Sequence, residues 1–175
     1  MILKQVPTFF VLLGAVGVIG AAHLAAQGTE EKPIVASAAT AKFGTIPNAP
    51  ECFTVAVERG DPTKGPSVIL ARFAPGCVAP FHWHTPSETA MVVSGSLQIQ
   101  MKGDSVLVAH RSDFVYLPAR HVHRATCLSS TACMVFLSSD AAFDIHWVDA
   151  AGQEIALETA IKSVKPAKTS QREKP

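Results

Sequence analysis

The sequence predicts a single all-β domain, folded as a barrel or a sandwich. Between residues 53 and 148, short segments of alternating apolar and polar residues recur at regular spacing, separated by turns rich in Gly, Pro, Asp and Ser. No long stretch of this region has the 3.6-residue apolar period of a helix. The length of 175 residues suits one domain, and 48% apolar residues suffice for its core.

The first two predicted strands differ in how much of their surface is buried. In the first, Phe53, Val55 and Val57 alternate with more polar residues, which is typical of a strand buried on one face. Residues 67–74 are nearly all apolar, so both faces of that strand are expected to be covered. Arg72 is the one charge there, and we expect it at the rim of the barrel rather than in the cavity.

The later predicted strands are shorter. Residues 97–102 alternate most regularly, and the Lys-Gly-Asp-Ser turn that follows predicts a hairpin. Phe114 and Tyr116 share one face of their strand, where both belong to the core or Tyr116 reaches the pocket with its hydroxyl. The remaining strands are expected at residues 106–109, 114–117, 121–126, 133–138 and 143–148.

Residues 1–26 have the pattern of a secretory signal peptide. Lys4 precedes a long apolar run, and small residues precede an expected cleavage between Ala26 and Gln27. The alternative is an uncleaved membrane anchor, but the run is short for a span of about 20 apolar residues and His23 interrupts it. The mature protein is therefore expected to be periplasmic or secreted, with no membrane contact after cleavage.

The segments that flank the predicted barrel are polar. Residues 27–42 are interpreted as a linker, and residues 151–175 as a short helix within residues 154–164 followed by a disordered tail. Lysine and arginine total 15 against 14 acidic residues, so no strong field favours nucleic acid or an anionic surface as a partner.

The four cysteines can form disulfides if the protein is exported, and four thiols allow three pairings. Cys127 and Cys133 bracket a polar turn between two predicted strands, so we expect them to face each other and pair. The pattern assigns no pairing to Cys52 and Cys77. No Cys-x-x-Cys motif is present, which argues against a thioredoxin-like role.

The strongest functional signal is a cluster of metal-ligand residue types. His82 and His84 are two residues apart, and Glu88 follows four residues later. Alternate side chains of an extended strand share a face, so these residues can converge on one point. Imidazole nitrogens and a carboxylate oxygen are typical ligands of a divalent transition metal.

The spacing Gly76, His82, His84, Glu88, Gly95 resembles the first motif of the cupin superfamily. The second cupin motif, a Pro before a turn and a later His, resembles the stretch from Ser112-Asp113 through Pro118-Ala119 to His123. Ser112 and Arg120 stand where the motif usually has Gly. The resemblance covers about residues 43–150 and implies a single double-stranded β-helix, the jelly-roll barrel of cupins.

The resemblance also implies a site. His123 would join His82, His84 and Glu88 as the fourth ligand of one divalent ion, with iron or manganese favoured and zinc, nickel or copper also accepted. His121 would be either a pocket group that supports the ligands or, as we favour, an exposed turn histidine. Cupins often dimerise, which leaves a homodimer open, but no residue identifies the oligomeric state.

The implied function is that of a small oxidoreductase resembling the quercetin dioxygenase-like cupins. It would act on a small oxygen-rich molecule bound at the metal, with Glu88 as the catalytic base. A non-catalytic, metal-dependent binding or sensing module is the alternative, and a barrel that holds its metal for stability alone is a third. The fold does not decide among them.

Overall fold

The computed structural model describes residues 32–164, which contain ten β-strands and one short α-helix. The predicted signal peptide and the residues from 165 onward lie outside this range. The elements are β1 (Phe53–Gly60), β2 (Ser67–Phe73), β3 (Val78–Trp83), β4 (Glu88–Ser94), β5 (Ser96–Met101), β6 (Val106–His110), β7 (Phe114–Leu117), β8 (His123–Cys127), β9 (Cys133–Ser139), β10 (His146–Trp147) and α1 (Leu157–Ser163). No helix in the described range has the length and apolar character that a membrane span requires.

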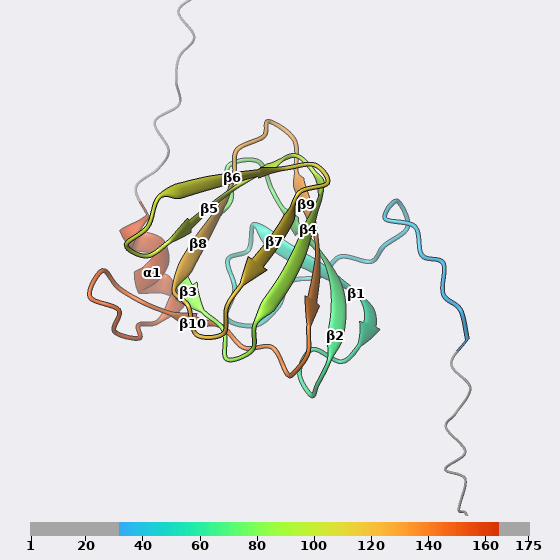
Figure 1. Ribbon diagram of the computed structural model, residues 1–175, viewed down its shortest axis with the longest axis horizontal. Coiled ribbons are helices and arrows are strands. Elements are labelled where there is room, and N and C mark those ends of the chain that lie inside the picture. The colour runs from blue at the N-terminus through green and yellow to red at the C-terminus, as the bar shows by residue number, and fades with distance from the viewer. Residues whose placement is uncertain (1–31, 165–175) are drawn as a thin grey trace, which may run out of the picture. The chain divides into compact units, whose positions relative to one another are not determined.

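The strands form two five-stranded antiparallel sheets that face each other (Figure 1). One sheet has the order β1-β2-β9-β4-β7, and the other has the order β10-β3-β8-β5-β6. Consecutive strands along the chain repeatedly lie in different sheets, as β3 and β4 do, which is the arrangement of a jelly roll. The predicted all-β jelly-roll barrel is confirmed.

The register of the first sheet places one row of apolar residues on its inner face. Ala71, Val135 and Val92 are paired across β2, β9 and β4, and all three are almost completely buried. Burying a side chain the size of Val stabilises the fold by about 1.5–3 kcal/mol. The core therefore comes from the alternating strands and does not depend on the polar residues of the site.

The prediction for Phe114 and Tyr116 is wrong, because their side chains lie on the outer face of the sheet. They are 64% and 56% exposed, and they pair with the outward-facing Met91 and Thr89 of β4. Val115 and Leu117, the other two residues of β7, face inward instead. Pairing with β4 decides which face of β7 is buried, and alternation within four residues does not reveal it.

Three smaller expectations need correction. Val57 is half exposed although it pairs with the buried Ile69, and the β1–β2 register shifts just after it. Of the strand predicted at residues 143–148, His146–Trp147 forms β10 and Val148 makes a single bridge to Glu154, whereas the preceding residues form a loop. The strand predicted from residue 121 begins at His123, which leaves His121 in the turn before it. The short predicted helix is present as α1.

Arg72 lies outside the cavity, as expected. Its side chain is exposed, and its guanidinium stacks over the Phe43 ring at 4.2 Å from the ring centre.

The four cysteines form two disulfides. Cys127–Cys133 confirms the predicted pairing, with a Cα–Cα distance of 5.7 Å. The second bridge, Cys52–Cys77, was not predicted. It connects the segment before β1 with the segment before β3, and so links the two sheets.

Ser112 and Arg120, which stand where the cupin motif usually has glycine, both adopt a left-handed backbone conformation. Ser112 has φ 73° and Arg120 has φ 58°, both in the left-handed region that disfavours side chains. Such a conformation costs on the order of 1–3 kcal/mol and persists because its surroundings hold it. The Arg120 N–H donates to the carbonyl oxygen of His84 at 2.8 Å, so this turn ties the second motif to the first.

Candidate metal centre

The four predicted ligands come from both sheets and meet inside the barrel. His82 lies in β3, directly opposite His123 of β8, and His84 follows β3 immediately. Glu88 is the first residue of β4 in the other sheet, so the turn between β3 and β4 brings it back towards the histidines. All four residues are buried, with exposed fractions between 2% and 6%.

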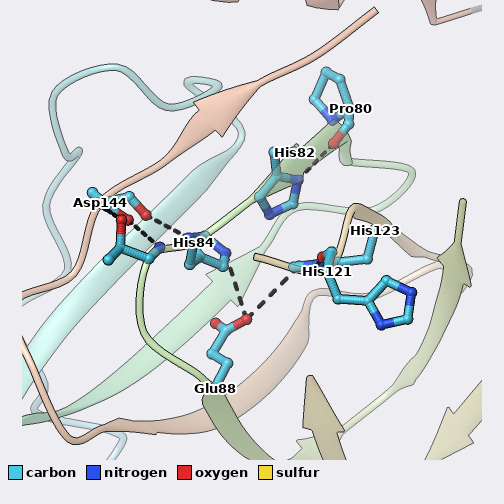
Figure 2. A network of polar contacts seen from close by, with 8 residues as sticks. Pro80, His82, His84, Glu88, His121, His123 and Asp144 are labelled. Carbon is cyan, nitrogen blue, oxygen red and sulfur yellow. Dashed lines mark hydrogen bonds and ion pairs between the residues drawn. The ribbon is translucent and has the colours of Figure 1, made fainter. Parts of the chain in front are cut away.

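The backbone fixes the orientation of all three imidazoles (Figure 2). The Nδ1–H groups of His82 and His123 donate to the carbonyl oxygens of Pro80 and His121 at 2.6 and 2.9 Å. His84 donates in the same way to the carbonyl oxygen of Asp144. Because a carbonyl oxygen only accepts, each Nδ1 carries the proton and each Nε2 presents a lone pair.

The ligand atoms are spaced as a metal ion requires. One ring nitrogen from each histidine lies within 4.8 Å of the others. The Nε2 atoms of His84 and His123 lie 3.5 and 3.8 Å from the same oxygen of Glu88. Two ligands each about 2.1 Å from an ion are separated by about 3.0 Å at a right angle and about 4.2 Å when opposite. The two Glu88 distances lie within this range, and the three imidazole nitrogens are close enough together that they could hold one ion.

Burial keeps the imidazoles uncharged. It holds the pKa of His82 well below the ordinary value and lowers that of His84 to about 4, and it also lowers the pKa of His123. The contacts of His84 and His123 with Glu88 are therefore not ion pairs at neutral pH. Burial raises the pKa of Glu88, which sits among groups without positive charge. Neutral imidazoles are the form that binds a metal.

The candidate ligands line one end of an otherwise apolar cavity. The space there open to the centres of water-sized molecules is about 60 Å³. Ala90, two residues after Glu88 in β4, lines the cavity, whereas Val92 packs in the core and does not line it.

The loop between β9 and β10 completes the site, and sequence reasoning missed it. The ring of Phe143 packs against His84, with ring centres 4.3 Å apart. The Asp144 carboxylate accepts hydrogen bonds from the N–H and the hydroxyl of Thr85, next to His84. His146 lies between Asp144 and Glu154, with its nitrogens 3.2 and 3.3 Å from their carboxylate oxygens. No spacing signal connects this loop to the first motif, about sixty residues away.

His121 is exposed, as expected, and its ring points away from the candidate ligands (Figure 2). Its backbone carbonyl nevertheless orients His123. The contribution of residue 121 therefore comes from its backbone and is independent of the imidazole.

Asp144→Ala is expected to weaken divalent-ion binding by about 10–100-fold without unfolding the barrel. The substitution removes both hydrogen bonds to Thr85, and the loop that presents a carbonyl oxygen to His84 would loosen. Titration with Mn²⁺ measures the effect.

Asp113→Ala is the matched control for that substitution. The Asp113 carboxylate also braces a turn, by accepting from the His110 N–H at 2.7 Å, but it lies near the other end of β4 from Glu88. Equal losses of affinity in the two variants would show that Asp144 has no specific role in positioning His84.

Comparisons with known proteins place these observations in a family. Residues 69–139 match the model of the Cupin domain family. No curated protein matches the sequence. An RmlC-like cupin protein from Ralstonia eutropha is 20% identical, with a TM-score of 0.55, and the match covers 72% of this chain and 80% of that one.

Two enzymes of known structure share the fold. The polyketide cyclase RemF from Streptomyces resistomycificus is 13% identical, with a TM-score of 0.58 and coverage of 67% of this chain and 87% of that one. An oxalate oxidase is 19% identical, with a TM-score of 0.51 and coverage of 66% and 63%. At these identities the likeness concerns the fold alone, and the chemistry of this chain depends on its own site residues.

Proposed function

We propose that this chain, which belongs to the cupin superfamily, is a metal-dependent oxidoreductase that acts on a small oxygen-rich molecule. His82, His84, Glu88 and His123 would hold one divalent ion, with iron or manganese favoured over zinc, nickel or copper. The observation that carries the proposal is the shared orientation of the imidazoles, each fixed by a backbone carbonyl with its Nε2 lone pair free for a metal.

A bound ion would act as a Lewis acid. It would lower the pKa of a substrate hydroxyl held beside it, or polarise a substrate carbonyl. The four residues leave up to two positions of a six-coordinate ion for a small molecule. Glu88 is placed to accept the proton from that molecule once its carboxylate releases the ion, because its oxygen faces the Nε2 atoms of His84 and His123 at the metal end. The resemblance to dioxygenase-like cupins and the fold shared with an oxalate oxidase support oxidation as the reaction class by analogy.

An oxygen-uptake screen of the metal-loaded protein against phenolic and dicarbonyl compounds tests the proposal. The expected result is uptake that depends on the ion and disappears in Glu88→Gln. This substitution keeps the size of the side chain but removes a carboxylate that is both ligand and base, so the ion content of the variant is measured beside its activity. Compounds that bind with no oxygen uptake and no chemical change would instead identify a binding or sensing module.

Ion affinity is expected to rise with pH. The pH at which half of the ion is lost should lie below 6.5, the ordinary pKa of an imidazole. Protons compete for the same lone pairs as the ion, but burial lowers the pKa of all three imidazoles and that of His84 to about 4. The site should therefore keep its ion through pH 6 and lose it as the pH falls towards 4. Equilibrium dialysis between pH 4 and pH 8 measures this, and half-loss already at pH 6.5 would contradict it.

We further propose that the protein is exported and cleaved between Ala26 and Gln27. Two disulfides support this location, because such bridges persist in oxidising compartments. N-terminal sequencing of the exported protein should begin at Gln27. Recovery of intact Met1 in the membrane fraction would favour an uncleaved anchor.

A further inference from the structure

Among residues 32–164, the candidate ligands are the only polar side chains of the cavity that can bind a ligand. Apart from those four residues, it is lined only by Ala, Pro, Phe, Leu, Ile, Val and Trp. Of these lining residues only Trp147 has a polar side-chain atom, and its indole N–H already donates to the carbonyl oxygen of Asn48 at 2.9 Å. Polar recognition within this cavity is therefore confined to the metal end.

Two arginines near the site contact aromatic rings and do not line the cavity. Arg120 stacks over Trp83 and Arg124 over Phe81, each with its guanidinium carbon 5.2 Å from the ring centre. Neither arginine lines the cavity, and among the described residues no lysine or arginine does. A negative group placed in the apolar part would have no cationic partner.

We propose, resting on the function proposed above, that the site takes small molecules whose oxygen atoms are gathered at one end and whose other end is an uncharged, apolar body. The oxygen-bearing group would lie at the metal end, between the histidines and Glu88. The body would lie against Phe53, Phe73, Leu97, Ile99, Val135 and Leu137, which come from both sheets.

The cost of burying charge is the physical reason for this selectivity. An anion moved out of water without a partner loses several kcal/mol of hydration, which exceeds what a few apolar contacts return. Dicarboxylates and phosphorylated molecules would therefore be rejected. The space of about 60 Å³ holds only a few water-sized groups, at roughly 10–15 Å³ each on the same measure, so the body is short.

Calorimetric titration of Mn²⁺-loaded protein with a matched pair of ligands tests the inference. 4-Methylpentanoate and succinate have the same arrangement of non-hydrogen atoms, and they differ in whether the far end is an isopropyl group or a carboxylate. We expect 4-methylpentanoate to bind at least about tenfold more tightly, because only succinate must bury a second charge. Succinate binding as tightly or more tightly would overturn the inference.

Ala90→Leu locates the binding position within the cavity. The longer side chain would project into the apolar part beside Glu88, so 4-methylpentanoate should bind at least about tenfold more weakly while the Mn²⁺ content stays unchanged. Thr89→Leu is the matched control on the same strand, because Thr89 faces outward and should leave binding unaltered. If Ala90→Leu does not fold by circular dichroism, Ala90→Val makes the same test with a smaller group.

Measuring Mn²⁺ content before each titration separates the two proposals. Protein that holds no Mn²⁺ overturns the proposed function, and the orientation of the ligand at the metal falls with it. Protein that holds Mn²⁺ but binds the two ligands equally leaves the metal site standing and overturns only the apolar selectivity. Unchanged 4-methylpentanoate binding in Ala90→Leu would likewise contradict the placement of the body.

Discussion

His123→Ala is expected to lose the stoichiometric divalent ion, whereas His121→Ala should retain it. His123 lies opposite His82 across the β3–β8 pair, and its removal takes away one of three nitrogen ligands from a buried site. Two imidazoles and a carboxylate remain, but losing one of four ligands is expected to lower the affinity enough for the ion to be lost on gel filtration. Elemental analysis after gel filtration gives the ion content per chain, and circular dichroism checks that the barrel still folds.

His121→Ala is the matched control, since it removes an imidazole two residues away. Its side chain is exposed, and the carbonyl that orients His123 belongs to the backbone and survives the substitution. Loss of the ion in both variants would mean that the His121 imidazole itself takes part in the site. Retention of the ion in both would remove His123 from the ligand set.

Loss of the Cys52–Cys77 bridge is expected to destabilise the protein by about 3–4 kcal/mol in the chain-entropy description of disulfides. The bridge closes a loop with a sequence separation of 25 residues, against 6 for Cys127–Cys133, whose loss should cost about 2 kcal/mol. The longer loop leaves the unfolded chain more freedom once it is opened. The double variants Cys52→Ala/Cys77→Ala and Cys127→Ala/Cys133→Ala, compared by urea unfolding, measure the difference.

The two bridges should also differ in their effect on the site. Cys52 follows closely on Ala49 and Pro50, which line the cavity, so losing its bridge should loosen that wall. Cys127–Cys133 closes the turn between β8 and β9, and none of the residues in that turn lines the cavity. If the shorter bridge proves the more stabilising one, loop length is not the dominant effect.

The candidate ligands could be predicted because their signal is local. His82, His84 and Glu88 lie within seven residues, and the turn between β3 and β4 joins them whatever the rest of the fold does. The strands could also be predicted, since alternation follows directly from burial on one face. The family resemblance added His123. Its pairing with β3 joins residues about forty positions apart, so no local sequence pattern reveals it.

The features that escaped prediction depend on contacts between distant segments. Asp144 supports His84 from a loop that looks like a strand in sequence. Tyr116 faces outward because β7 pairs with β4 in one register, and a shift by one residue would have reversed it. Cys52 and Cys77 meet only after the two sheets pack together. In each case the partner, and with it the role, is set by the tertiary fold.

The ion content of the wild-type protein, compared with that of His82→Ala/His84→Ala, tests the central claim most directly. We expect about one divalent ion per wild-type chain and none in the double variant, with unchanged circular dichroism, because the core comes from the apolar strands and not from the imidazoles. A full complement of ion in the double variant would contradict the metal centre, and the proposed function would fall with it.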